Sequence, residues 1–276
     1  MAAQGAVNSE AAGSNPTLPA RFFKALTKVR VFCVWALYVK RCDMNCAYCT
    51  LVSTDNYTWG AICLSISKRR TAAKYPLVIL VSDSVSDDNK RLLSDYGIVK
   101  VIPNHKFEHS YYDNYLCTKQ KLEVFNLTEY DRVMFLDADV VMMDDFDYEL
   151  EHNSLLFDVR ARYDDCKNAP KVCGEMFIIT PSVDVFNILD TISTENNLQD
   201  DEQCLAYIYR PSFLVPLNKS GYSTFYDKAT HFCEIGEKMI DIDAPYFSNS
   251  GKYWEHYDMN DEVAIQLVNA IICRRN

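Results

Sequence analysis

A short apolar run at residues 133–136 ends in two aspartates, Asp137 and Asp139, and this pattern constrains the fold more than any other. A continuous apolar run of this length is typical of a strand in a sheet that is covered on both faces. If side chains still alternate where the strand ends, Asp137 and Asp139 project to the same side while Ala138 turns away. Two carboxylates aimed together at the carboxyl edge of an α/β sheet suit a hard divalent cation that carries phosphates.

The Asp-x-Asp pattern is not specific by itself. Roughly two such triplets are expected by chance from the aspartate content. The chain has three, and the other two lie at residues 145–147 and 241–243. Only the triplet at 137–139 directly follows a four-residue apolar run, so the prediction of a metal site applies to Asp137 and Asp139.

Predicted strands and helices alternate along the chain. The strands are expected at residues 47–52, 77–81, 98–102, 133–136 and 176–180, and the helices at 57–69, 87–96, 116–126, 183–193 and 262–273. Ser86 or Asp87 is expected to cap the second helix, and Gly97 to end it. Residues 148–168 are polar and are interpreted as an irregular surface excursion. Such alternation predicts an α/β fold with a mostly parallel sheet and helices on both faces.

Composition narrows the function. A chain of 276 residues with 49% hydrophobic content can bury one sizeable core. Its formal charge of −10 and pI near 5.0 argue against a nucleic-acid-binding protein, which needs a basic face. If such an acidic protein binds an anionic ligand, we expect it to use a cation at the site.

The N-terminal region shows no secretory signal. Residues 1–19 are small and polar, which favours a disordered tail. The apolar stretch at 31–39 is too short for a transmembrane helix, which needs about 20 residues. We interpret it as a strand or tail helix packed on the domain, with a membrane-surface anchor as the alternative. A cytoplasmic location is expected, with Golgi association as the alternative.

The eleven cysteines do not form the even framework of a small secreted scaffold, so most are expected to be buried thiols. Cys42, Cys46 and Cys49 have the C-x3-C-x2-C spacing that holds a [4Fe–4S] cluster in radical S-adenosylmethionine enzymes. Against this alternative, no Gly-Gly-Glu-like stretch follows, and Cys49 falls in the first predicted strand. We expect no cluster.

Residues 47–150 resemble the nucleotide-binding half of the glycogenin-like retaining glycosyltransferases, which are family 8 enzymes with the GT-A fold. Several motifs agree with that family in order and spacing. They lie at residues 50–57, 60–61, 64–65, 77–81, 85–86, 121–122, 127–131 and 135–139, followed by a later strand and turn at 176–182.

The resemblance implies a uridine diphosphate (UDP) sugar donor and a Mn²⁺ or Mg²⁺ ion on Asp137 and Asp139. It also implies that Lys121 contacts the sugar or phosphate region of the donor, with Lys119 as the alternative if the alignment slips. The residues that would line the uridine pocket are Leu51, Ser53, Thr54 and Tyr57, with Ala138 allowing the nucleotide to approach.

The acceptor side departs from the family pattern. Residues 173–175 read Cys-Gly-Glu where the family has Asn-Ser-Gly. Residues 201–203 read Asp-Glu-Gln where the family has Gly-Asp-Gln, so the resemblance assigns the catalytic region to Glu202 and Gln203. The longer Glu side chain shifts the reach of the carboxylate by about one methylene, which matters where placement is tight.

The closing family motif, His-Phe-x-Gly-x-x-Lys-Pro-Trp, corresponds to residues 246–254. Lys252 keeps its match and would steady the diphosphate as a point charge. Tyr246 stands where the family has its third metal ligand, a histidine. A neutral phenol with a pKa of about 10 is a poor replacement. Asp243 and His231 are therefore alternatives for that ligand.

The resemblance thus implies a metal-dependent retaining glycosyltransferase that moves a hexose or related sugar from a UDP-sugar. The acceptor, whether carbohydrate, lipid or protein, stays open. The alternative from these departures is a degenerate family member that binds nucleotide-sugar with little transfer. We expect residues 1–46 to be a tail of unknown role, 47–254 the GT-A domain, and 255–276 a terminal helix or tail.

Overall fold

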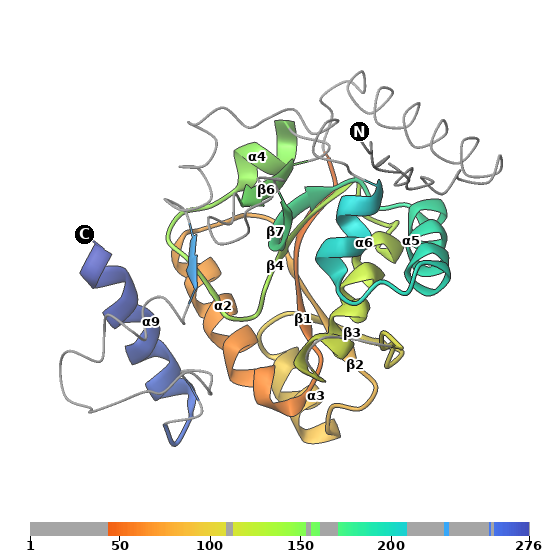
Figure 1. The fold of residues 1–276 in the computed structure, drawn as a ribbon. Coiled ribbons are helices and arrows are strands. Elements are labelled where there is room, and N and C mark those ends of the chain that lie inside the picture. Colours follow the sequence, from red (N-terminus) through yellow and green to blue (C-terminus); the bar gives the residue numbers. More distant parts are fainter. Residues whose placement is uncertain are drawn as a thin grey trace, which may run out of the picture.

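The computed structural model describes residues 44–108, 113–152, 156–160, 171–208, 229–231, 254 and 257–275 (Figure 1). The strands are β1 (Cys46–Val52), β2 (Leu77–Ser82), β3 (Ile98–Ile102), β4 (Arg132–Leu136), β5 (Val140–Met142), β6 (Leu156–Arg160), β7 (Lys171–Ile179) and β8 (Ala229–His231). The α-helices are α2 (Thr58–Arg70), α3 (Asp87–Ser94), α4 (Asp147–His152), α5 (Val183–Glu195), α6 (Asp201–Ile208) and α9 (Asp261–Arg275). Two 3₁₀ segments are η1 (Asp55–Tyr57) and η2 (Asp113–Asn126). The predictions for the tail at 1–19, the apolar stretch at 31–39 and Cys42 lie outside the described residues.

The main sheet has the strand order β3-β2-β1-β4-β7-β6. Strands β3, β2, β1 and β4 run parallel, whereas β7 is antiparallel to both of its neighbours. Strands β5 and β8 form a separate antiparallel pair. The predicted α/β fold with a mostly parallel sheet is therefore confirmed.

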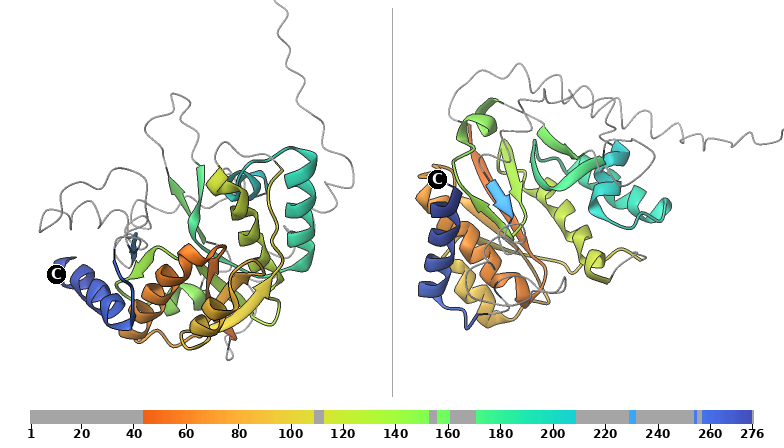
Figure 2. Two further views of the ribbon diagram at one scale, coloured as in Figure 1. Left: turned by 90° about the horizontal axis from the view of Figure 1, so that it is seen from below. Right: turned by 60° about the vertical axis from the view of Figure 1, so that its left-hand side comes forward.

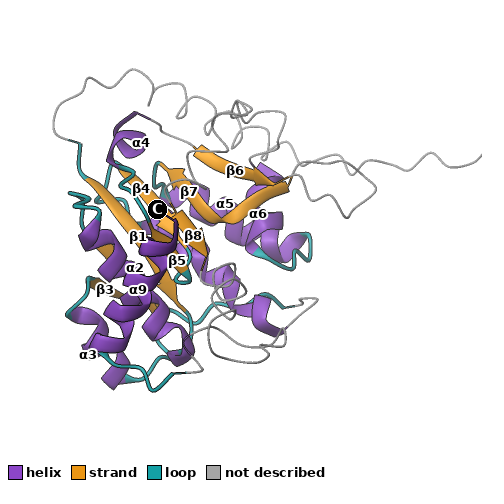
Figure 3. Ribbon diagram, turned by 90° about the vertical axis from the view of Figure 1, so that its left-hand side faces the viewer, coloured by secondary structure: helices purple, strands orange, loops and turns teal. Residues whose placement is uncertain are grey.

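Helices cover both faces of the sheet, as predicted. Figure 3 shows α2, α3 and α9 on one side of the strands and α5 and α6 on the other. Residues of β1 alternate between the two cores: Tyr48 and Val52 pack with α2 and α9, whereas Cys49 and Leu51 pack with η2 and α5. Because both faces are buried, β1, β2 and β4 are mostly apolar, and the exceptions are Thr50, Ser82 and Arg132.

Helix α9 lies along α2, as the terminal helix was expected to do (Figure 2). Its buried positions are Ala264, Leu267, Val268 and Ile271, which recur at the three- and four-residue spacing of one helical face. Within the part of the chain that the structure describes, no helix combines the length and apolar character needed to cross a bilayer.

Helix α3 begins at Asp87, as predicted, and its last residue is Ser94, two residues before the predicted end. The Ser86 hydroxyl accepts a hydrogen bond from the Asn89 N–H, and the Gly97 N–H donates to the Leu93 carbonyl at 3.1 Å. A Cβ at Gly97 would lie 2.8 Å from the Leu77 carbonyl oxygen, so only glycine allows this close approach to β2.

The prediction of an irregular excursion over residues 148–168 was wrong in its described parts. Residues 148–152 continue α4, and residues 156–160 form β6, which pairs with β7 and completes the sheet. The physical reason is that the edge of β7 supplies unpaired backbone groups, and strand pairing overrides the polar composition of the segment.

The cluster alternative is excluded by the positions of Cys46 and Cys49. Both are fully buried in β1, three residues apart, and they pack in the cores on opposite faces of the sheet. Burial also raises the pKa of the Cys46 thiol to about 11, which disfavours the thiolate that iron needs. These two side chains cannot ligate one cluster.

Tyr48 joins β1 to the start of α4 and gives the first prediction. Its buried phenol donates to Asp147 at 2.9 Å and accepts from the Phe146 N–H at 2.8 Å. Tyr48→Phe should lower the free energy of unfolding by about 1–3 kcal/mol, because the Phe146 N–H then loses a buried partner. Urea denaturation measures the change. Tyr96→Phe, which removes an exposed bond to Asp261, is the control, and an equal loss in both variants would contradict this account.

Candidate active site

The candidate site lies at the carboxyl edge of the parallel strands. The chain runs outward from β1 to β2 and β3, and β4 then pairs on the opposite side of β1. Ligands of open α/β sheets bind where the strand order reverses in this way. The turn after β4 and the loop after β1 therefore meet at the position where a ligand is expected.

Asp137 and Asp139 occupy a tight turn. The expectation that alternation along an extended strand places both side chains was wrong, because the Val140 N–H donates to the Asp137 carbonyl at 3.0 Å and closes a turn. The Asp137 N–H donates to the Glu175 carbonyl at 2.9 Å, which anchors the turn to β7. Asp139 is only 7% exposed.

The charges of the two carboxylates interact. Burial raises the pKa of Asp137, Lys121 opposes this, and the nearby charge of Asp139 raises it further, to about 7. The turn therefore brings the two carboxylates of the predicted metal site together, although by a different backbone geometry from the expected one.

Lys121 lies beside Asp137, where the resemblance placed a donor contact. Its ammonium is 2.8 Å and 3.2 Å from the two Asp137 oxygens and donates to the Gly174 carbonyl at 3.3 Å. It also lies 3.3 Å from Asp201 Oδ2. Burial would lower the pKa of Lys121, but Asp137 and Asp201 together raise it well above its ordinary value. Lys121 therefore remains charged. Lys119, the alternative, instead pairs with Asp190 at 2.8 Å.

Asp201 is a site residue that the sequence interpretation missed. It is 3% exposed, and its Oδ2 lies at ion-pair distance from Lys121 without an aligned hydrogen bond. A Cβ at Gly174 would lie 2.1 Å from this oxygen, so a side chain at position 174 would displace the Asp201 carboxylate. The sequence did contain a hint, because Asp201 and Glu202 are adjacent in the segment at residues 201–203. Either acid could have been the one that points towards Lys121.

Glu202 also lies beside the ion cluster formed by Lys121, Asp137 and Asp201. Its Oε1 accepts a hydrogen bond from the Gly174 N–H at 3.3 Å. Burial raises the pKa of Glu202, and the neighbouring Asp201 carboxylate raises it further. Gly174 thus contacts Lys121 through its carbonyl and Glu202 through its N–H.

Gln203 does not join Lys121. Its backbone N–H and side-chain NH₂ donate to the Asp200 carboxylate at 2.7 Å and 3.1 Å, and its side-chain oxygen accepts from the Gln199 N–H at 3.2 Å. Asp200 thus caps α6, and Gln203 reaches back to the residue before the cap in a variant of the capping box. The Asp-x-x-Gln pattern before the apolar residues of α6 was readable in the sequence.

The residues expected to line a uridine pocket gather at the same edge. Leu51 is buried near the end of β1, and the Tyr57 N–H donates to the Thr54 carbonyl at 3.0 Å just beyond it. Ser53 lies between them. The backbone of Ala138 packs against Gly60 of α2, where a Cβ would lie 2.7 Å from the Ala138 carbonyl oxygen.

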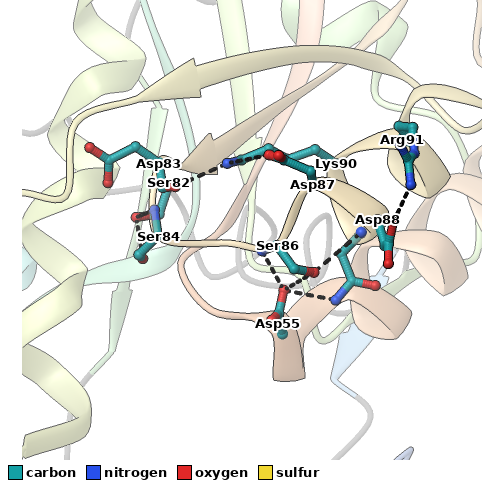
Figure 4. A network of polar contacts seen from close by, with 10 residues as sticks. Asp55, Ser82, Asp83, Ser84, Ser86, Asp87, Asp88, Lys90 and Arg91 are labelled. Atoms are coloured by element: carbon teal, nitrogen blue, oxygen red, sulfur yellow. Dashed lines mark hydrogen bonds and ion pairs between the residues drawn. The ribbon is translucent and has the colours of Figure 1, made fainter.

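Asp55 holds this loop to the start of α3 (Figure 4). One oxygen of its carboxylate accepts from the Ser86 N–H at 2.9 Å, the Ser86 hydroxyl at 3.0 Å and the Asn89 amide at 2.8 Å. The Asn89 amide and then the two Ser86 donors hold the pKa of Asp55 below its usual range. The loop after β1 and the turn after β2 are thereby joined.

Trp254 contacts the same loop from the far end of the chain. It is 3% exposed, its indole N–H donates to the Asn56 carbonyl, and its ring lies edge-on to Tyr57 with centroids 6.1 Å apart. Lys252, Tyr246 and Asp243 lie outside the described residues.

Two carboxylates on one turn fit a cation that is shared with phosphate. In the described ranges, no group of three or more His, Cys, Asp or Glu side chains is arranged to hold a metal alone. Mg²⁺ is usually bound through one or two carboxylates together with substrate phosphates and water. Asp137 and Asp139 match that mode.

Comparison with known proteins finds relatives named as a glucuronosyltransferase, glycogenin and galactinol synthase. No family model matches the sequence. Inositol phosphorylceramide glucuronosyltransferase 1 of Arabidopsis thaliana is 28% identical over 60% of this chain and 30% of its own length. Glycogenin-1 of Mus musculus is 26% identical over 59% of this chain and 50% of its own. Galactinol synthase 1 of Solanum lycopersicum is 24% identical over 79% of this chain and 78% of its own.

The resemblance to glycogenin-like glycosyltransferases is confirmed. The match spans half or less of the glucuronosyltransferase and of glycogenin-1. The galactosyltransferase LgtC, solved with donor and acceptor sugar analogues, superposes with a TM-score of 0.54 over 81% of this chain and 95% of LgtC. At 14% identity this likeness shows the fold, which is GT-A.

The loop contact of Asp55 gives a pH-dependent prediction for the GT-A domain. Its folded-state pKa is lowered, so its ionised form stabilises the fold above the unfolded pKa of about 3.9. That contribution is lost as the pH falls through the folded-state pKa. Asp55→Asn should therefore lower the thermal unfolding midpoint at pH 7, and the difference from wild type should shrink as the pH falls below the unfolded pKa of about 3.9. Asp83→Asn is the control, and a difference for Asp55→Asn that does not shrink on acidification would contradict the charge-based explanation.

Proposed function

We propose that this protein is a metal-dependent retaining glycosyltransferase that transfers a hexose or related sugar from a UDP-sugar. The observation that carries the proposal is the Lys121 ammonium held between Asp137 and Asp201, beside Asp139, where the strand order reverses. The relatives named as glycosyltransferases support the reaction class. Donor and stereochemistry come from the family resemblance.

The charge of the cluster supports a metal requirement. Asp137 and Asp201 pair with the Lys121 ammonium, Asp139 lies near Asp137 and Glu202 lies near Asp201, so the formal charge of these five groups is −3. An anionic diphosphate would be repelled by such a site. Asp137 and Asp139 would hold the cation, which when bound neutralises charge on the leaving diphosphate and is worth several kcal/mol in such roles.

The remaining residues have roles that need no metal. Lys121 supplies a fixed positive charge for the donor, and its two carboxylate neighbours keep it protonated. Glu202, held by the Gly174 N–H, carries the carboxylate of the catalytic region. Leu51, Ser53, Thr54 and Tyr57 would bind uridine, with Ala138 beside it, and Lys252 would steady the diphosphate.

Among the three alternatives for the third metal ligand we propose His231. Strand β8 pairs with β5 so that His231 lies opposite Val140, the residue that follows Asp139. This register brings the backbone of His231 next to the turn at residues 137–140, which we call the metal turn. A neutral imidazole is an established ligand for divalent transition-metal ions, whereas a neutral phenol with a pKa of about 10 is a poor one.

A second function is favoured by two departures from the family pattern, Cys173 in place of an asparagine and Tyr246 in place of a histidine. In addition, the Gln203 amide is occupied by hydrogen bonds at the start of α6. A family member that binds UDP-sugar but transfers it poorly is therefore the alternative. The relatives' names include lipid, polysaccharide and small-sugar chemistry, so the acceptor is left as carbohydrate, lipid or protein.

Binding and transfer are tested separately. Calorimetry with UDP should show binding that requires Mn²⁺. Intact-mass measurement after incubation with Mn²⁺ and a panel of nucleotide-sugars reports self-transfer, and chromatography reports free sugar. Mn²⁺-dependent UDP binding without any transfer favours the binding-only alternative, and no UDP binding would overturn both functions.

Asp139→Asn should weaken Mn²⁺-dependent UDP binding by at least about 100-fold, because a neutral amide cannot replace a carboxylate on a divalent ion. The fold should persist, as circular dichroism can show. Asp88→Asn, a change of the same size on exposed α3, should leave the affinity unchanged. Equal UDP affinity in wild type and Asp139→Asn would remove Asp139 from the metal site.

His231→Ala should weaken Mn²⁺ affinity by on the order of tenfold or more, since even residues that only support a ligand cost that much. Tyr246→His should have little effect on Mn²⁺ titrations if His231 fills the position. The reverse pattern, in which Tyr246→His raises the Mn²⁺ affinity and His231→Ala leaves it unchanged, would assign the third ligand position to residue 246. Damage from Asp243→Ala alone would assign it to Asp243.

A further inference from the structure

We infer that Trp254 is a positioning residue that holds the nucleotide loop, residues 54–57, against the Asp137–Asp139 turn. The part of this inference that concerns nucleotide affinity rests on the proposed function. Trp254 lies 198 positions from the residue to which it donates, so this contact is made only in the folded chain.

The contact with the loop has a polar and an apolar component. The indole N–H donates to the Asn56 carbonyl, a backbone group inside the loop. The ring packs edge-on against Tyr57, one of the residues expected to line the uridine pocket, with centroids 6.1 Å apart. Because Trp254 is 3% exposed, this hydrogen bond lies in the interior, and removal of the N–H takes a donor away from the Asn56 carbonyl.

The contact with the metal turn passes over Gly60. A Cβ placed on Gly60 would lie 2.7 Å from the Ala138 carbonyl oxygen and 2.7 Å from Cη2 of the Trp254 ring. The first turn of α2, the ring and the backbone between Asp137 and Asp139 therefore meet around one glycine. Only the absence of a side chain at Gly60 allows them to come this close.

Trp254 and Asp55 hold the loop from two directions. Asp55 joins it to α3 through Ser86 and Asn89, whereas Trp254 joins it to α2 and the metal turn. Helix α2 itself is fixed by the apolar core, so it provides a rigid support. The distance between the uridine-binding loop and the carboxylates that would hold the cation is thus set by a residue from the C-terminal part of the chain.

Trp254→Phe tests this, because it keeps a ring but removes the N–H donor. Trp59→Phe is the matched control, since Trp59 is a half-buried tryptophan on α2 that packs on the same core. Hydrogen exchange of residues 54–58 without ligand, and the Kd for UDP with Mn²⁺, are measured in both. Trp254→Phe should speed exchange and raise the Kd by about 5- to 10-fold, the effect of one lost hydrogen bond, while Trp59→Phe changes neither.

Gly60→Ala is the second variant, because its methyl group crowds both the Trp254 ring and the Ala138 carbonyl at the point where they meet, without changing the indole. It should shift both measurements in the same direction. Exchange and affinity that match those of Trp59→Phe in both variants would overturn the inference. Faster exchange with unchanged UDP affinity would also overturn it, since Trp254 would then be structural only. If wild type binds no UDP, the proposed function fails, and the exchange of residues 54–58 and 137–142 alone decides whether Trp254 holds the two segments together.

Discussion

A buried ammonium between two carboxylates is the interaction on which the site depends. Lys121 cannot be left unpaired in the interior, because an isolated buried charge is far more costly than a paired one. Asp137 and Asp201 satisfy it from opposite elements, the turn after β4 and the start of α6. The three side chains therefore require η2, β4 and α6 to meet at one point, and Asp201 donates its N–H to the Thr118 hydroxyl of η2 as well.

The backbone around Gly174 is shaped by this ion cluster. Its carbonyl accepts from Lys121, its N–H donates to Glu202, and its missing side chain makes room for Asp201. Strand β7 can present these groups at the site because it runs antiparallel to β4, which brings its beginning to the carboxyl edge of the parallel strands. One reversed strand thus supplies backbone groups that a wholly parallel sheet would place at the opposite edge.

The two halves of the candidate site differ in how closely they follow the family pattern. The half proposed to bind the donor retains the loop after β1, the acidic turn and Lys121, and Asp55 and Trp254 contact that loop. The half proposed to face the acceptor has Cys173 where the family has asparagine, and Gln203 caps α6 there. Under the proposed function, donor binding and sugar transfer rely on residues from different elements and can therefore diverge.

The sequence by itself determined what depends on local pattern: the buried strands, the amphipathic helices, the Ser86 cap and the acidic pair after an apolar strand. It did not determine which neighbouring acid reaches Lys121. Successive residues of a helix point about 100° apart, so the choice between Asp201 and Glu202 depends on where α6 begins and on the space beside Gly174. Tertiary structure also decided that residues 156–160 form an edge strand and that Trp254 meets the loop after β1. These contacts join residues far apart in the chain, and their energy comes from burial and pairing that no local stretch of sequence contains.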